Sequence, residues 1–179
     1  MALVCLVGLA ACGRAHTTTA QRAGPPAGGG GNAATIVRVV DGDTVIVSLS
    51  GRQERVRLIG VDTPESVKPN TPVQCFALEA SARTKALLPP GTGVLLERDA
   101  DLRDRYKRLL AYIYRSSDGL FVNLVLAREG YALPYTFPPN VAHADEFVAA
   151  AGEARAAHRG LWSRCRDPSA PLEAAHGTG

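Results

Sequence analysis

Short runs of β-branched residues alternate with polar ones through the first half of the chain, a pattern typical of half-buried strands. The first two runs are separated by Asp41-Gly42-Asp43, a turn signal that favours a hairpin. The predicted strands cover residues 35–40, 44–49, 53–61, 93–99 and 108–114. Five strands without an internal repeat predict a small closed sheet.

Three other segments have the apolar spacing and end signals of helices. They cover residues 73–88, 121–128 and 143–158. The first stops at a Pro-Pro-Gly turn, and glycine follows closely after the other two, where it commonly ends a helix. This order of elements predicts an α+β domain at residues 34–165, built as a five-stranded OB-fold barrel with three helices.

The two ends differ in composition from this domain. Residues 1–12 are apolar and small, too short for a stable membrane anchor but suited to a secretory signal. Their ending, Leu-Ala-Ala-Cys, resembles the lipobox of bacterial lipoproteins, which implies a lipid on Cys12; an ordinary secretory signal is the alternative, because basic residues are missing before it. Residues 13–33 predict a flexible linker and 166–179 a disordered tail. We therefore expect an exported bacterial protein, either a cell-envelope lipoprotein or secreted.

The cysteine count then becomes informative. Cys5 would leave with the signal and Cys12 would carry lipid, so Cys75 and Cys165 remain in the folded part. In an oxidising compartment, two thiols predict one disulfide. Two unpaired, buried cysteines are the alternative.

Bulk charge does not indicate a partner. The chain has 20 Lys and Arg against 17 Asp and Glu, a net charge of +3, which is too small to argue for nucleic acid by itself. An anionic substrate would have to be bound by a local cluster. Acidic and arginine residues do gather in three segments, 41–44, 57–65 and 104–108. Oxygen ligands suit calcium, and the chain lacks the Cys or His spacing of a zinc site.

Each residue of these segments has an ordinary structural interpretation when taken alone. Asp41 and Asp43 could serve only the turn. Arg57 lies in an apolar strand, so it needs either a partner carboxylate or a phosphate. Glu65 and Arg108 could be surface residues.

The order and spacing of these residues favour a catalytic site over separate structural roles. Arg57 stands five residues before Asp62, and Glu65 stands three after it. With the segments 79–82, 110–114 and 161–163, this arrangement resembles the thermonuclease family of staphylococcal-nuclease-like enzymes over residues 35–163. The resemblance implies a calcium-dependent endonuclease that cleaves DNA and RNA, single strands preferred, and leaves 3′-phosphates.

The resemblance also implies roles for individual residues. Calcium would be held by the carboxylates of Asp43 and Asp62 and the backbone carbonyl of Thr63. The catalytic residues would be Arg57, Glu65 and Arg108. Residues lining the nucleotide site would be Arg105, Tyr106 and Tyr135, with core packing as the alternative for the two tyrosines. Asp41 and Asp104 are left without a role.

The chain departs from the family pattern at four positions. Lys107 stands where a glycine often precedes the catalytic arginine, and Phe137 replaces a second tyrosine. Asn70 and Thr71 fall where lysines can occur. These changes concern substrate affinity more than catalysis.

Two other classes of protein remain open at this point. One is a catalytically inert OB or Tudor-like module that binds nucleic acid or protein, and the other is an envelope lipoprotein with a structural calcium site. An inert module has no need of the arginines and Glu65 together. We expect a monomer whose partners are DNA and RNA, with membrane contact only through Cys12.

Overall fold

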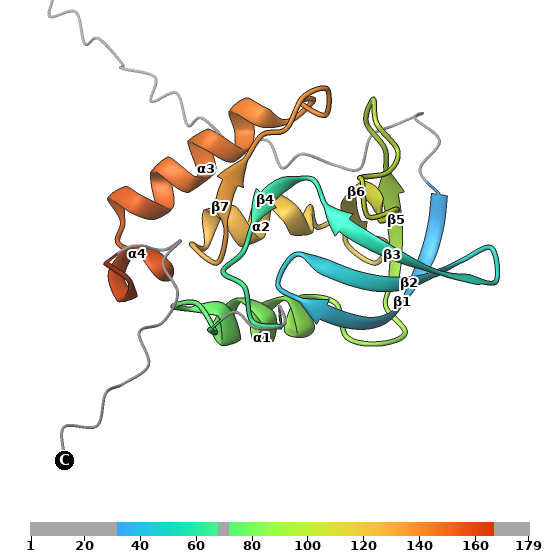
Figure 1. Cartoon of the computed structure of the whole chain (residues 1–179), viewed down its shortest axis with the longest axis horizontal. Helices are drawn as coiled ribbons and strands as arrows, with labels where there is room; N and C mark the ends of the chain where they lie inside the picture. Colours follow the sequence, from blue (N-terminus) through green and yellow to red (C-terminus); the bar gives the residue numbers. More distant parts are fainter. Residues whose placement is uncertain (1–31, 68–71, 167–179) are drawn as a thin grey trace, which may run out of the picture.

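Five strands close a barrel in the order β1-β2-β3-β6-β5 in the computed structural model, which describes residues 32–67 and 72–166 (Figure 1). The strands are β1 (Asn32–Asp41), β2 (Thr44–Leu49), β3 (Arg52–Leu58), β5 (Gly93–Glu97) and β6 (Leu109–Arg115). Neighbours pair antiparallel except β3 and β6, which are parallel. The predicted five-stranded OB-type barrel in an α+β chain is confirmed.

The three predicted helices are present, and a short fourth one follows them. They are α1 (Ala77–Leu87), α2 (Val122–Arg128), α3 (Ala144–Ala156) and α4 (Leu161–Arg164). Helix α1 packs against β1, whereas α2 and α3 pack together beside the barrel (Figure 1). Helix α1 begins four residues later than its pattern predicted, because Phe76 has a left-handed backbone with φ of 67°.

The predicted third strand is wrong at its end, because it breaks after Leu58. A separate strand, β4 (Gly60–Asp62), pairs with β7 (Leu133–Tyr135), which the sequence pattern did not predict. Gly60 has φ of 82°, and a Cβ there would overlap the ring of Phe147. Only glycine suits this position, and the bend carries the residues after it away from the barrel wall.

A buried asparagine satisfies the backbone groups at this break. The Asn123 side chain donates to the carbonyls of Ile59 at 2.9 Å and Ala111 at 3.3 Å, and it accepts from the Ile113 N–H at 2.9 Å. A buried backbone group without a partner would cost about 1–3 kcal/mol. The break between β3 and β4 is therefore a built feature of the fold.

The barrel interior is apolar and closed to solvent. Its fully buried side chains include Val45, Val47, Val56, Leu96 and Ile113. Burial of each such side chain stabilises by about 1.5–3 kcal/mol. This rigid wall supports the polar segments at the barrel mouth.

Cys75 and Cys165 form a disulfide, with Cα atoms 5.9 Å apart and a sequence separation of 90. Of the predicted linker, residues 32 and 33 belong to β1, where they pair with β5. The predicted signal with Cys12, the rest of the linker, Asn70, Thr71 and the tail from 167 lie outside the described residues. Within the described part of the chain, no helix has the length and apolar character needed to cross a membrane.

Candidate functional site

The hairpin turn between β1 and β2 is joined to the segment after β4 through Asp43. This carboxylate is buried and accepts from the Thr63 N–H at 3.0 Å and from the Thr44 hydroxyl at 3.0 Å. The turn is also held from α1, because the Thr84 hydroxyl donates to the Gly42 carbonyl at 2.6 Å. A Cβ on Gly42 would overlap the Thr63 side chain. The two candidate metal-ligand segments are thus fixed against each other.

Arg57 lies between the two candidate ligand carboxylates. Its guanidinium is 2.7 Å from Asp62 and 3.2 Å from Asp43, and the side chain is only 12% exposed. Nη1 also donates to the carbonyls of Leu58 at 2.9 Å and Val61 at 2.7 Å. Among the described residues, Nε of Arg57 has no hydrogen-bond partner and can donate to a ligand. The partner carboxylate that was one of the two alternatives for this arginine is present, and Nε remains available to the other, a phosphate.

The carboxylates at this end of the barrel affect one another. Partial burial raises the pKa of Asp62, and Asp43 adds to the rise while Arg57 and Arg108 oppose it. Burial and a hydrogen bond with Asp41 raise the pKa of Glu65. The charged residues that affect these two carboxylates come from the hairpin of β1 and β2, from β3 and from the turn before β6.

Asp41 holds the start of the loop that carries Glu65. Its carboxylate accepts from the Ser66 hydroxyl at 2.5 Å and the Ser66 N–H at 3.2 Å, besides the Gly42 N–H at 2.9 Å. Sequence analysis left Asp41 without a role because its partner lies 25 residues away. The feature of the sequence that could have indicated this contact is Ser66, a hydroxyl residue directly after the candidate glutamate.

Arg108 stands just before β6 and is held by Asp104. The Nε–H donates to one carboxylate oxygen at 2.6 Å and the Arg108 backbone N–H donates to the other at 2.9 Å. The guanidinium also lies over the Tyr106 ring, 5.4 Å from its centroid. Within the described part of the chain, no hydrogen bond occupies its two Nη groups. Asp104, which the sequence analysis left without a role, therefore fixes the position of Arg108.

The predicted nucleotide-contacting residues are all exposed. The Tyr106 ring is 65% exposed, and its hydroxyl accepts from Arg105 at 2.7 Å. Tyr135, at the end of β7, is 48% exposed and stacks with Phe137 at a centroid distance of 6.4 Å. Core packing, the alternative considered for the two tyrosines, is wrong. Exposed aromatic faces can stack on bases.

The donor set fits a hard cation in type. Asp43, Asp62 and the Thr63 carbonyl offer only oxygen, as calcium prefers. The buried Thr63 hydroxyl has no hydrogen-bond partner among the described residues, so a polar group beside Asp43 is available to a bound water or ion. The described residues hold no group of three His, Cys, Asp or Glu side chains with metal-binding spacing. A bound ion would therefore rely on backbone carbonyl and water ligands besides the two aspartates.

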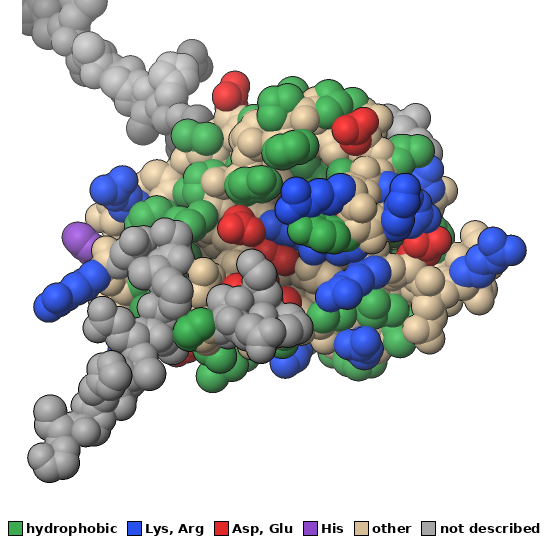
Figure 2. Space-filling view, in the orientation of Figure 1, with side chains coloured by type: hydrophobic (Ala, Val, Ile, Leu, Met, Phe, Trp, Pro, Cys, Tyr) green, Lys and Arg blue, Asp and Glu red, His purple; other side chains and the backbone are tan. Residues whose placement is uncertain are grey.

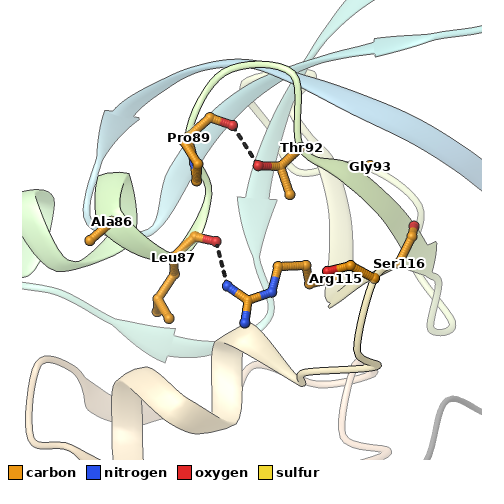
Figure 3. Close-up of a pocket in the computed structure, with 8 residues that line it drawn as sticks. Ala86, Leu87, Pro89, Thr92, Gly93, Arg115 and Ser116 are labelled. Carbon is orange, nitrogen blue, oxygen red and sulfur yellow. Dashed lines mark hydrogen bonds between the residues drawn. The ribbon is translucent and has the colours of Figure 1, made fainter.

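A cavity of about 550 Å³ lies elsewhere, between the turn after α1 and the end of β6 (Figure 3). In it Arg115 donates to the Leu87 carbonyl at 3.2 Å and pairs with Asp118 at 2.5 Å. None of its lining residues belongs to the carboxylate and arginine cluster. Because its one charged group is already paired, we place the candidate site at the cluster.

Acidic side chains gather near the middle of the face shown in Figure 2, with Lys and Arg side chains beside and below them. This position corresponds to the region near β4 in Figure 1. The molecule is an OB-type barrel with carboxylate oxygens and guanidinium groups assembled at one end.

Comparison with known proteins agrees with this architecture. The family described as "Staphylococcal nuclease homologue" matches residues 55–164. The chain is 43% identical to the thermonuclease of Staphylococcus hyicus over 128 residues, which cover 72% of this chain and 74% of that protein. It is 46% identical to the thermonuclease of Staphylococcus intermedius over 129 residues, 72% and 75% of the two chains. It is 40% identical to the endonuclease YncB of Bacillus subtilis (strain 168) over 131 residues, 73% and 61% of the two chains.

The chain belongs to the staphylococcal nuclease family, as the resemblance in its sequence indicated. Membership supports a nuclease, and so a hydrolase, function. The matched range includes Arg57, Asp62, Glu65 and Arg108, whereas Asp43 lies before it.

Proposed function

We propose that this protein is an exported, calcium-dependent endonuclease that hydrolyses phosphodiester bonds of DNA and RNA. The proposal rests mainly on the position of Arg57, which is held by two carbonyls and two aspartates while its Nε has no partner among residues 32–67 and 72–166. A guanidinium fixed in this way is suited to a phosphate, to which Nε can donate a charge-assisted hydrogen bond. The thermonucleases and the endonuclease that the chain resembles support this class of substrate.

Asp43, Asp62 and the Thr63 carbonyl would hold the calcium ion. When bound, the ion would supply a positive charge close to the scissile phosphate. Arg57 and Arg108 would bind phosphoryl oxygens and stabilise the charge that gathers on them in the transition state. Arg57 lies in β3 and Arg108 just before β6, and Arg108 is near enough to lower the pKa of Asp62.

Glu65 would orient or deprotonate the attacking water. An oxygen–phosphorus bond forms from that water, the bond from phosphorus to the 5′-oxygen breaks, and the products are a 3′-phosphate and a 5′-hydroxyl. Burial and Asp41 raise the pKa of Glu65, and a carboxylate with a raised pKa is a better proton acceptor. Loss of one such group typically costs a factor of about 10²–10⁴.

Single strands would be the better substrates. Tyr106, with Arg105 beside it, and Tyr135 expose rings near the cluster, and unpaired bases can stack on such rings. Phe137 extends the Tyr135 ring without a hydroxyl, so it adds stacking area but no hydrogen bond. We further propose that the chain is a monomer, and that it is exported and tethered through Cys12 or released.

Metal-dependent cleavage tests the proposal directly. Purified protein should cut denatured DNA and RNA in calcium, stop in chelator, and regain activity when calcium is restored. The new 3′ ends should accept label only after removal of the 3′-phosphate. Intact nucleic acid in calcium would favour the inert binding module, which a retained affinity for single strands would identify.

A further inference from the structure

The loop that begins at Glu65 is closed at its base by Gln74. The Glu65 N–H donates to the Gln74 side-chain carbonyl at 2.5 Å, and the Gln74 N–H donates to the Glu65 carbonyl at 3.0 Å. One residue therefore satisfies both backbone groups of the candidate catalytic glutamate. This reciprocal pair fixes the main chain of Glu65 and does not involve its carboxylate, which accepts from the Val67 N–H at 3.2 Å.

The residue after Gln74 is covalently attached to the far end of the domain. Cys75 forms the disulfide with Cys165, which directly follows α4. Helix α4 is itself fixed, because the Leu161 N–H donates to the Gly130 carbonyl at 2.9 Å. The backbones at Gly130 and Gly160 approach so closely that a Cβ on either would overlap the other segment. The disulfide thus ties Gln74 to a rigid part of the molecule.

The next residue continues this attachment. The Phe76 ring packs against Tyr131 with centroids 5.3 Å apart, and Tyr131 directly follows Gly130. Phe76 keeps a left-handed backbone, which is uncommon for an aromatic residue and here accompanies these tertiary contacts. Gln74, Cys75 and Phe76 are therefore fastened in turn to Glu65, to Cys165 and to Tyr131.

We propose that Gln74 is a positioning residue for Glu65, and that the Cys75–Cys165 disulfide holds Gln74 where it can act. The inference rests on the proposed role of Glu65 in handling water. In the pair described, Gln74 contacts the main chain of Glu65, so this pair acts on Glu65 through the position of its backbone. A displacement of about 1 Å at a catalytic group can cost a factor of about 10² in rate. Substrate binding by the arginines does not depend on this pair.

Four variants test the inference through kcat and KM on denatured DNA in calcium. Gln74→Met keeps the length of the side chain and removes the acceptor, whereas Gln74→Glu keeps an acceptor oxygen. The double variant Cys75→Ala/Cys165→Ala removes the disulfide. Arg83→Met is the matched control, because it breaks the Arg83–Glu129 ion pair of α1, with contacts of 2.6 and 2.7 Å, away from the loop.

We expect kcat to fall about tenfold to a hundredfold in Gln74→Met and in the double cysteine variant, with KM almost unchanged. Gln74→Glu should restore most of kcat, and Arg83→Met should keep it despite lower stability. Unchanged kcat in Gln74→Met and the cysteine variant, or an equal loss in Arg83→Met, overturns the inference. An inactive wild type would instead refute the proposed function, so the two failures are distinct.

Discussion

Asp104 holds the side chain and the backbone of Arg108 with a single carboxylate. One oxygen accepts the Nε–H at 2.6 Å, and the other accepts the backbone N–H at 2.9 Å. An arginine whose Nε–H donates to a carboxylate presents both Nη groups in a fixed direction. The geometry of Arg108 is therefore set before any substrate arrives.

Removal of the hydrogen bonds between Asp104 and Arg108 should lower activity without unfolding the protein. We expect Asp104→Ala to reduce kcat/KM about tenfold to a hundredfold, because Arg108 would have to be ordered in each encounter. Asp101→Ala is a matched control, since that exposed carboxylate in the same loop makes no hydrogen bond or ion pair among the described residues. Steady-state cleavage of denatured DNA gives the comparison. Equal rates for the two variants would remove Asp104 from the site.

Lys107 occupies a backbone conformation that favours glycine. Its φ is 64°, and it lies between Tyr106 and Arg108 where the family resemblance led us to expect glycine. Lys107→Gly should raise the free energy of unfolding by about 1 kcal/mol, because a side chain in the left-handed region costs about that much. Urea unfolding measures the change. Lys107→Ala keeps the Cβ and should give no such gain; an equal gain would rule out backbone strain.

His143 predicts a pH dependence of stability. Burial alone would lower its pKa, but hydrogen bonds with Glu146 at 2.7 Å and Glu97 at 3.1 Å outweigh it and raise the pKa. The folded protein thus binds the proton more tightly than the unfolded chain does. The stabilisation is complete below the unfolded pKa of about 6.5 and is lost as pH rises through the folded value.

Unfolding in urea at about pH 6 and about pH 9 measures this loss. The free energy of unfolding should be lower at the higher pH, and the difference should shrink in His143→Gln. A wild-type stability that rises across this range, with no change in the variant, would contradict the assignment.

The disulfide should contribute to stability as well as to position. Cys75 and Cys165 enclose a loop of about 90 residues, for which the chain-entropy model gives about 4 kcal/mol. Reduction should therefore lower the midpoint of urea unfolding, and the double alanine variant should lose the response to reductant. Mass spectrometry should find two added hydrogens after reduction. An oxidised protein that lacks this bond would refute the prediction.

The barrel and the candidate residues could be predicted because they depend on local pattern and on spacing. Runs of β-branched residues predicted the strands, and the spacing of Arg57, Asp62 and Glu65 along the chain predicted the candidate site. The break at Ile59 could not be predicted in this way, because its cause is the Gly60 contact with Phe147 from a distant helix. Because apolar residues stand on both sides of the break, the sequence pattern predicted a single strand there.

The supporting contacts of the site were also beyond sequence pattern. The Asp41 carboxylate accepts a hydrogen bond from Ser66, 25 residues away in sequence, and the Gln74 side chain accepts one from the Glu65 N–H on the other side of a loop. Such pairs exist only after the hairpin turn and α1 are packed together. Asp104 was closer to prediction, because it stands four residues before Arg108, but no periodic pattern marked that turn.

Cleavage by a Glu65→Gln variant tests the central claim most directly. Denatured DNA labelled at its 5′ end would be treated with wild type and variant at saturating calcium, with substrate binding measured in parallel. The account predicts that kcat falls by at least about a hundredfold while binding is retained, because the amide cannot take a proton from water. Equal cleavage rates for the two proteins would contradict it.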